Sequence, residues 1–270
     1  MYRIPLDQTW QPSSPLLIID FRVALFQILY SSQRGDYYLQ WQSYLNRLPI
    51  KMGLQSAPII IVDDQKGGRN DTYWRQDWLN LNSEYLPKYK GQRLPKPDVY
   101  DNLYKKGIEY IKTNNIDYFA SPSKEADDWA GLVFRLKQTV EINAEIIFCT
   151  IDQDWQQLVD DKLCIKVYCD GNWKQISRLK DELEVLLDYK ADLGSTYDIV
   201  DHKMAFGDAG DNIVPGSPRE IIDLRIVPPD PHNFSLDEEQ ALYEAIKRPK
   251  FITNKRTALE AAMELNNVEF

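Results

Sequence analysis

The distribution of apolar residues predicts a series of short strands separated by helices. Residues 16–19, 58–62 and 145–150 are apolar runs without alternation, which is typical of strands buried on both faces of a sheet. Two shorter runs that also predict strands cover residues 116–119 and 164–168. Helical patterns follow at residues 23–32, 125–140 and 154–159. This alternation predicts an α/β domain with a mainly parallel sheet flanked by helices.

The alternation breaks down between residues 65 and 103. Turn-forming residues interrupt this segment at Gly67, Gly68, Pro87, Gly91, Pro95 and Pro97. Aromatic residues alternate there with basic ones, and they include Tyr73, Trp74, Trp78, Tyr85 and Tyr89. A connection this long inside a compact domain usually has a function of its own, so we expect an insertion over about residues 66–112.

Helical patterns dominate the last third of the chain. They cover residues 177–189, 198–206, 235–247 and 255–266. We therefore predict two domains: an α/β domain over residues 1–176 that carries the insertion, and a helical region over residues 177–270.

The composition indicates an intracellular protein. The chain has 270 residues and 43% hydrophobic content, which is enough for one substantial core or a core with a small appended domain. No apolar run is long enough to cross a bilayer, and the start of the sequence has no signal pattern, so we expect no membrane partner. Cys149, Cys164 and Cys169 have no zinc-site spacing and are expected to be reduced thiols.

The charge is unevenly distributed. The net charge is −9, which argues against a protein that simply coats nucleic acid. Residues 66–112, however, contain ten Lys and Arg against six Asp and Glu. An acidic body with a basic insertion fits an enzyme whose acids hold cations and whose insertion holds phosphates, although a solvated charged loop would have the same composition.

Acidic residues follow each of the three long strands. Asp20 ends the first, Asp63 and Asp64 follow the second, and Asp152 and Asp154 follow the third. A single aspartate at such a place is a common turn or cap residue. The carboxyl ends of parallel strands share one edge of a sheet, where ligands bind, so three strands that end this way predict one cluster.

Two further acidic groups are expected near the same edge. Glu125, Asp127 and Asp128 open a predicted helix, where acids also interact favourably with the helix dipole. Asp208 and Asp211 lie three residues apart, either on one side of a helical turn or in an Asx-capped turn. Both alternatives are open from the sequence alone.

So many carboxylates around one point would raise their own pKa values unless cations neutralise them. Oxygen ligands without nearby His or Cys favour Mg²⁺ or Mn²⁺ over zinc. Two such ions about 3.5–4 Å apart activate water and stabilise the leaving oxygen in phosphodiester hydrolysis. His202 and His232 are the only histidines in the chain. Water activated by a bound cation would replace the general base that a histidine often provides.

These residues resemble a known family. The motifs are Leu-Leu-Ile-Ile-Asp20, Val62-Asp63, Leu-Pro-Lys-Tyr-Lys-Gly-Gln-Arg93, Glu125-Ala-Asp-Asp128, Asp152-Gln-Asp154 and Gly207-Asp-Ala-Gly-Asp-Asn212. In this order and spacing, over most of residues 16–216, they resemble the phage and bacterial 5′-3′ exonuclease and flap endonuclease family, which includes the 5′ nuclease domain of DNA polymerase I. The resemblance implies a PIN-like sheet, a helical arch over residues 66–112 and a helix-turn-helix in the C-terminal region.

The resemblance also implies roles for individual residues. One metal ion would be held around Asp20, Asp63, Glu125, Asp127 and Asp128, and a second near Asp152, Asp154, Asp208 and Asp211. Lys90 and Arg93 match the basic residues that face the scissile phosphate, so the implied catalytic set is Asp20, Asp63, Lys90, Arg93 and Asp128. The implied nucleic-acid contacts are Arg75, Tyr89, Lys90, Arg93 and Asn212.

The chain departs from the family pattern in three places. Phe21-Arg22 stands where a glycine usually follows the first aspartate, and Asp64-Gln65 likewise replaces the glycine after the second. After Pro215-Gly216 the expected glycines of the second hairpin are missing, which leaves the duplex contact and a potassium site open. Beyond Leu224 the resemblance gives no guidance, and the basic residues there, Lys247, Arg248, Lys250, Lys255 and Arg256, could contact phosphate or form a solvated helix face.

We therefore expect a Mg²⁺-dependent, structure-specific 5′ nuclease of replication or repair, a monomer that acts on DNA with 5′ ends or flaps. We expect it in the cytoplasm of a bacterium or of a phage-infected host. Two alternatives are a related metal-dependent ribonuclease that acts on RNA/DNA hybrids and a catalytically inactive nucleic-acid-binding module. The retained acids argue against the inactive module, because unused clustered carboxylates would destabilise the fold.

Overall fold

The computed structural model describes residues 14–31, 35–66, 73–82, 90, 96–140, 142–169, 172–174, 199–208, 211–229 and 232–252. The predicted helices over residues 177–189 and 255–266 lie outside the described residues. None of the helices in the described ranges is long and apolar enough to span a membrane.

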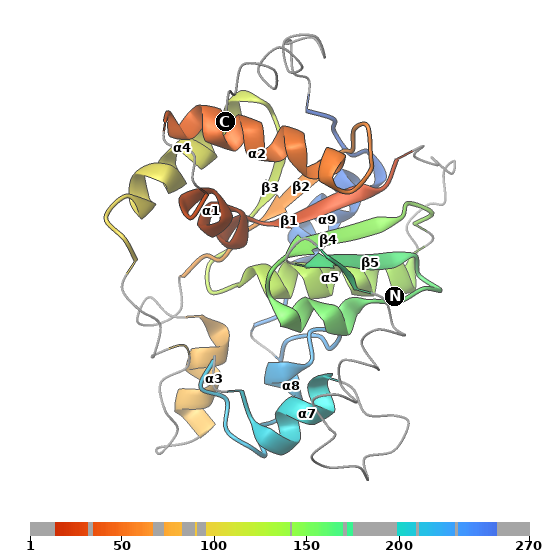
Figure 1. Ribbon diagram of the computed structural model, residues 1–270. Helices are drawn as coiled ribbons and strands as arrows, with labels where there is room; N and C mark the ends of the chain where they lie inside the picture. Colours follow the sequence, from red (N-terminus) through yellow and green to blue (C-terminus); the bar gives the residue numbers. More distant parts are fainter. Residues whose placement is uncertain are drawn as a thin grey trace.

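A six-stranded sheet in the order β3-β2-β1-β4-β5-β6 forms the centre of the molecule (Figure 1). Its strands are β1 (Leu16–Asp20), β2 (Ile59–Val62), β3 (Asp117–Phe119), β4 (Ile146–Thr150), β5 (Ile165–Cys169) and β6 (Asn172–Lys174). The first five are parallel to their neighbours, and β6 pairs antiparallel with β5. All five strands predicted from the apolar runs are present, and the mainly parallel sheet is confirmed.

Both faces of the sheet are buried, which explains why its strands are apolar without alternation. Leu16 and Ile18 of β1 face one hydrophobic cluster, and Leu17 and Ile19 face the other. Parallel register places β1 between β2 and β4, with Ile18 level with Ile60 and Phe148. The central strands are thus fixed from both sides, and so are the residues that follow them.

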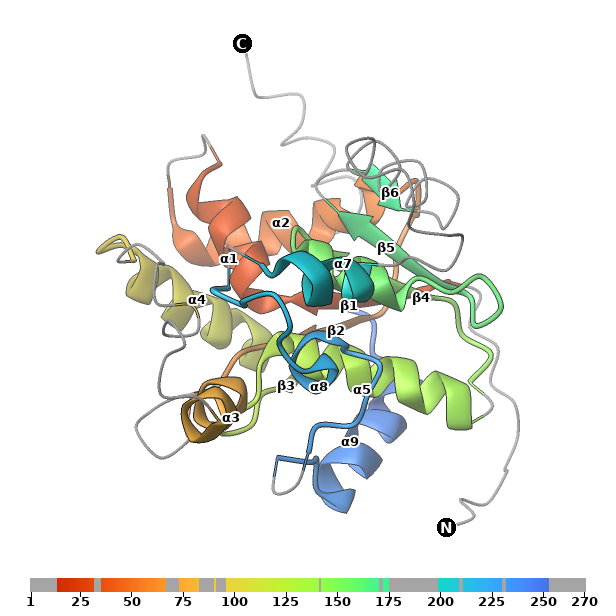
Figure 2. The same cartoon turned by 90° about the horizontal axis from the view of Figure 1, so that it is seen from below.

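Helices cover each face of the sheet (Figure 2). On one face lie α1 (Phe21–Leu29), α2 (Tyr37–Lys51) and α4 (Tyr100–Thr113). On the other lie α5 (Ala126–Thr139), the 3₁₀ helix η1 (Gln153–Leu158) and α9 (Leu236–Lys247). Because α9 packs on the same core as α5, residues after 177 contribute to the main body. The domain boundary near residue 177 stays a prediction.

The sequence pattern did not predict α2 or α4, and the reason lies in their mutual packing. Trp41 of α2 is fully buried, stacks on Phe21 and donates its indole N–H to the Leu103 carbonyl at 3.0 Å. Gly107 of α4 gives this ring its space, since a Cβ there would lie 2.6 Å from the Trp41 ring. An aromatic residue opposite a glycine is a tertiary match that helical periodicity does not reveal.

A third cluster joins the insertion to the C-terminal region. Helix α3 (Trp74–Asn82) packs with α7 (Ile199–Phe206) and α8 (Arg219–Ile222), away from the sheet's own cores. Figure 1 shows these helices as a separate layer below the sheet. The predicted helix over residues 198–206 corresponds to α7, whereas α3 lies in the segment where the alternation of strands and helices breaks down. The buried Trp74 of α3 packs in one cluster with Ile221 and Ile222, which lie far away in the sequence.

Candidate active site

The ends of the neighbouring parallel strands β1 and β4 place two aspartates at the same edge of the sheet. Each aspartate also caps the helix that follows its strand. Asp20 ends β1 and begins α1, with its Oδ1 accepting the Val23 N–H at 3.1 Å. Asp152 follows β4 and begins η1, with its Oδ1 accepting the Asp154 N–H at 2.9 Å. Cap geometry therefore fixes both side chains at the turn between strand and helix.

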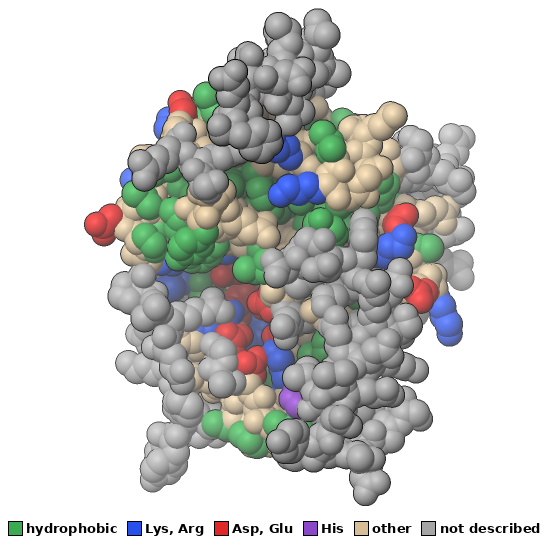
Figure 3. Space-filling view, viewed as in Figure 1, with side chains coloured by type: hydrophobic (Ala, Val, Ile, Leu, Met, Phe, Trp, Pro, Cys, Tyr) green, Lys and Arg blue, Asp and Glu red, His purple; other side chains and the backbone are tan. Residues whose placement is uncertain are grey.

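A pocket of about 460 Å³ opens at this edge. Its acidic lining comes from five separate segments and comprises Asp20, Asp64, Asp127, Asp152, Asp154, Asp208 and Asp211. Its cationic lining comprises Arg22, Lys90 and Lys203. Figure 3 shows acidic and basic side chains gathered in a hollow on this face of the molecule. The convergence predicted from the strand ends is thus present, with carboxylates in clear excess.

Asp127 and Asp64 are oriented by buried hydrogen-bond donors. The Trp155 indole N–H donates to Asp127 Oδ1 at 2.7 Å. The Ala126 N–H, at the start of α5, donates to Asp64 Oδ1 at 2.8 Å. Such outer contacts hold carboxylates in one orientation and are typical of preorganised ligand sites.

Asp154, Asp208 and Asp211 form the tightest acidic group. They offer carboxylate oxygens that all lie within 4.8 Å of one another. Lys203 forms ion pairs with both Asp154 and Asp208, which offsets part of their repulsion. Burial opposes the charge of Lys203, but these two aspartates raise its pKa above the ordinary value.

Asp208 and Asp211 lie in a tight turn and not on a helical turn, which corrects one of the two alternatives left open by the sequence. Helix α7 ends at Phe206, and Gly207 follows with φ 77°. Asp208 and Ile213 then exchange backbone hydrogen bonds of 2.7 and 2.9 Å. A Cβ on Gly207 would meet the Ile213 carbonyl oxygen at 2.5 Å, so the turn requires glycine there for space as well as for its positive φ.

Behind the pocket, Glu125 and Asp128 are neutralised by internal cations. The Arg75 guanidinium pairs with both, at 2.8 Å from Glu125 and 2.9 Å from Asp128, and Lys90 also pairs with Glu125. Trp74 donates its indole N–H to Asp128 at 3.0 Å. Burial alone would raise the pKa of Glu125, but Lys90 and Arg75 hold it below the usual value. Arg75 is 4% exposed and does not line the pocket.

Asp63 and Asp64 are adjacent at the end of β2 but point to different surroundings. Asp63 is fully buried, forms an ion pair of 2.5 Å with Arg22, and accepts the hydroxyl protons of Tyr104 at 3.0 Å and Tyr118 at 2.7 Å. Asp64 lines the pocket. Successive side chains leaving a strand diverge, so only one of the pair can face the site.

Crowding and burial change the acidity of the pocket. Burial, helped by Asp127 and Asp154, raises the pKa of Asp152 to about 8. Burial and the charge of Asp64 raise the pKa of Asp20 well above its usual range. The pKa values of Asp64 and Asp154 are raised to about 6, again mainly by burial. Buried oxygen ligands with raised pKa values fit divalent cations, whose charge would favour the ionised carboxylates.

The pocket contains seven of the fourteen residues predicted for the site. Those found there are Asp20, Asp127, Asp152, Asp154, Asp208, Asp211 and Lys90. Asn212, with φ 57° and 8% exposure, lies in the tight turn. Tyr89 and Arg93 lie outside the described residues. The sequence reasoning gave no role to Lys203 and noted Arg22 only as a departure from the pattern. The position of Lys203, five residues before Asp208 near the end of a predicted helix, was the available signal.

The fold and site define a mixed α/β protein with an acidic pocket at the carboxyl edge of its mainly parallel sheet. The chain is 28% identical over 174 residues to Flap endonuclease Xni from Pectobacterium atrosepticum, a match that covers 63% of this chain and 60% of that protein. It thus spans less than two thirds of the length of this relative. No protein-family model matches the chain.

One solved structure, of a T5 protein, shows the same fold. The T5 D15 protein co-crystallised with metal ions is 18% identical, with a TM-score of 0.50 over 86% of this chain and 85% of that chain. The T5 5′-exonuclease with bound zinc ions is 19% identical, with a TM-score of 0.49 and the same coverage. The sequence match and the shared fold confirm the resemblance of this chain to the 5′ nuclease and flap endonuclease family.

The raised pKa values of the pocket acids predict an unusual pH dependence for the protein without divalent ions. Because the folded pKa of Asp152 exceeds that of an exposed aspartate, the folded state binds this proton more tightly and loses stability as the pH rises toward about 8. Thermal unfolding in EDTA should therefore show a lower Tm at about pH 8 than at about pH 6. Asp152→Asn should flatten this slope and raise the Tm at the higher pH. Asp161→Asn, at an exposed position, is the matched control, and an Asp152→Asn protein with the wild-type slope would contradict the electrostatic picture.

Proposed function

We propose that the protein is a structure-specific 5′ nuclease that hydrolyses DNA phosphodiesters with the help of divalent cations. The observation that carries the proposal is the pocket in which seven carboxylates from five segments outnumber three cationic side chains. A relative that is a flap endonuclease, and a fold shared with a T5 protein crystallised with metal ions, support the same activity. We expect a monomer acting in the cytoplasm of a bacterium or of a phage-infected host.

Two groups of carboxylates suit divalent cations. Asp154, Asp208 and Asp211 would hold one ion, since their oxygens converge within 4.8 Å. A second ion would be held by the remaining acids of the pocket: Asp20, Asp64, Asp127 and Asp152. Hard oxygen ligands favour Mg²⁺ or Mn²⁺. When bound, such cations polarise phosphate oxygens and lower the pKa of water at the scissile bond.

Lys90 brings a positive charge from the insertion to the edge of the pocket. Its backbone N–H donates to the Asp211 carbonyl at 3.1 Å, which ties the insertion to the tight turn. Its ammonium pairs with Glu125 and lies 3.8 Å from Asp211 Oδ2. We assign Lys90 to the scissile phosphate, where it would stabilise the negative charge that develops in the transition state.

Arg22 supplies a second, more rigid cation. Its Nε donates to Asp63 at 2.5 Å, one terminal nitrogen donates to the Tyr100 hydroxyl at 2.7 Å, and the other donates to the Asp64 carbonyl at 2.9 Å. The guanidinium also lies over the Tyr104 ring at 4.7 Å. A guanidinium has five N–H groups, so two remain for a ligand in the pocket.

This geometry gives Asp63 a positioning role in place of the metal-binding role implied by the resemblance. Burial opposes the charge of Arg22, but Asp63 raises the pKa of Arg22 above its usual value and so keeps the cation charged. Two N–H groups on a fixed plane match two oxygens of a phosphodiester. We assign Arg22, which follows the position where the family pattern has glycine, to substrate phosphate.

The two alternative functions, a ribonuclease and an inactive nucleic-acid-binding module, predict different properties for the same pocket. A ribonuclease would use the same acids, so substrate preference has to be measured with RNA. A catalytically inactive binding module would retain a crowded acidic pocket that costs stability and repels nucleic acid.

A cleavage panel tests the function directly. We expect the purified protein to cut a 5′-flap DNA in Mg²⁺ or Mn²⁺, more slowly a nicked or single-stranded DNA, and to be inactive in EDTA. Asp154→Asn should reduce the rate by about 100-fold or more, because it removes an acid from the tightest group. Asp161→Asn is the control. Preferential cutting of RNA strands would favour the ribonuclease, and a wild-type protein that cuts neither polymer would refute the proposal.

The role of Arg22 is tested by comparing two substitutions. Arg22→Gln removes the charge, whereas Arg22→Lys keeps the charge and loses the planar fork, so we expect both to slow flap cleavage, by about tenfold or more for Arg22→Gln. Lys105→Gln, at an exposed site on α4, is the control. Thermal unfolding checks that the variants fold. Arg22→Gln with wild-type kcat and KM would remove the residue from the proposed phosphate contact.

A further inference from the structure

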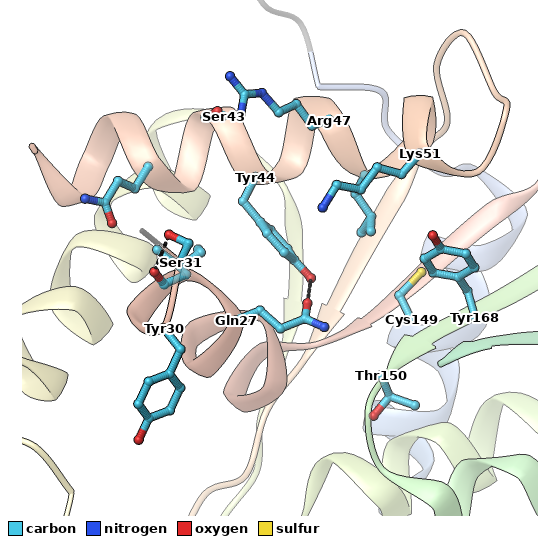
Figure 4. A pocket seen from close by; sticks show the side chains of 13 residues that line it. Gln27, Tyr30, Ser31, Ser43, Tyr44, Arg47, Lys51, Cys149, Thr150 and Tyr168 are labelled. Atoms are coloured by element: carbon cyan, nitrogen blue, oxygen red, sulfur yellow. Dashed lines mark hydrogen bonds between the residues drawn. The ribbon is translucent and has the colours of Figure 1, made fainter. Parts of the chain in front are cut away.

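A second cavity, of about 410 Å³, lies between α1, α2 and the ends of β4 and β5. Helix α2 forms one wall with residues at helical spacing, from Gln40 to Lys51. The C-terminal turn of α1 and the ends of β4 and β5 form the others. Figure 4 shows the side chains of these elements around one space between α2 and the strand ends. Its size is that of a small-molecule site.

The polar groups around this cavity are suited to an anion. Its lining includes Arg47 and Lys51 and has no acidic side chain among the described residues. Figure 4 shows the Lys51 ammonium directed into the space, with Arg47 at the rim pointing outward. Neither cation has a carboxylate partner in the described part of the chain, although the protein carries a net charge of −9. Lys51 therefore brings a positive charge to this cavity that no acidic side chain of its lining neutralises.

Gln27 adds a neutral donor to the same space. The Tyr44 hydroxyl donates to Gln27 Oε1 at 2.7 Å, which fixes the orientation of the amide. The amide nitrogen then points toward the strand ends (Figure 4). A hydrogen-bonded amide with its N–H groups presented to a cavity is a typical ligand contact.

The remaining wall is apolar and aromatic. Cys149 is buried, and burial raises the pKa of its thiol, so it contributes a neutral sulfur surface. The rings of Tyr44 and Tyr168 and the side chains of Ile28 and Leu48 complete this wall. A flat apolar wall beside a cation suits a planar base attached to a phosphate.

The cavity is joined to the carboxylate pocket through one residue. Thr150 lines the cavity, while its Oγ1 accepts the Asp152 N–H at 2.9 Å and lies 3.5 Å from Asp20 Oδ2. The turn after β4 therefore forms the edge of both spaces. A nucleotide in the cavity would lie next to the acids of the proposed cleavage site.

We propose that this cavity binds one nucleotide, with its phosphate at Lys51 and its base against the Tyr44 and Tyr168 wall. The proposal rests on the nuclease function, because DNA cleavage supplies the ligand, either as the terminal nucleotide of a strand or as a released nucleoside monophosphate. The two sources share the phosphate and base that the cavity recognises.

Calorimetric titration of the full chain with thymidine 5′-monophosphate in EDTA tests the proposal, since without divalent ions the acidic pocket repels phosphate. We expect saturable binding that Lys51→Met weakens by about tenfold or more, through loss of a charge-assisted contact. Gln27→Leu should also weaken it, and it serves as the second variant if Lys51→Met unfolds. Lys105→Met, at an exposed site on α4, should bind as wild type does.

Comparison ligands separate the remaining outcomes. Tighter binding of a 5′-phosphorylated thymidine dinucleotide than of the mononucleotide assigns the cavity to a strand end, and the reverse order assigns it to the released product. Inorganic phosphate binding as tightly as the mononucleotide overturns the proposal, as does the absence of binding or an unchanged affinity in both Lys51→Met and Gln27→Leu. Flap cleavage in Mg²⁺ by the same preparation reports on the nuclease function separately, so either proposal can fail alone.

Discussion

Repulsion among buried carboxylates at one edge of the sheet is the constraint on which the rest of the site depends. Strand order brings Asp20, Asp64 and Asp152 to this edge, and the start of α5 and the turn after α7 add further acids. Each is held by caps or buried donors, so the acids cannot move apart to relieve the repulsion. Burial, together with this repulsion, raises the pKa values of Asp20 and Asp152. Only positive charge can relieve it.

Positive charge is distributed differently over two layers of acids, one buried behind the pocket and one lining it. In the inner layer each buried acid is paired with a cation: Arg22 pairs with Asp63, and Arg75 pairs with both Glu125 and Asp128. In the outer layer, facing the pocket, the lining cations are fewer than the acids, and Lys203 bridges two of these acids. The ion pairs of the inner layer hold the backbone behind the pocket in a fixed position. The acids of the outer layer exceed the cations that line the pocket, so divalent cations would balance their charge.

The sequence predicted the parts of this arrangement that local patterns determine. Asp20 and Asp152 could be placed because they end apolar runs and cap the helices that follow. The choice between Asp63 and Asp64 could not be made, since it depends on which neighbour meets Arg22 and the tyrosines of α4 and β3. Helices α2, α3 and α4 were missed because their burial relies on distant partners: Gly107 opposite Trp41, and Ile221 and Ile222 opposite Trp74. The charged contacts of Arg75 and Lys203 are tertiary for the same reason.

Binding of Mn²⁺ to the chain, followed by calorimetry in buffers of different ionisation enthalpy, tests the central claim most directly. Because the pKa of Asp152 is raised to about 8 and that of Asp20 is also raised, the account predicts that Mn²⁺ binds at neutral pH with release of protons, and that Asp152→Asn reduces this release. A chain that binds no Mn²⁺, or binds it without releasing a proton, would contradict the idea that external cations relieve the crowding of these acids.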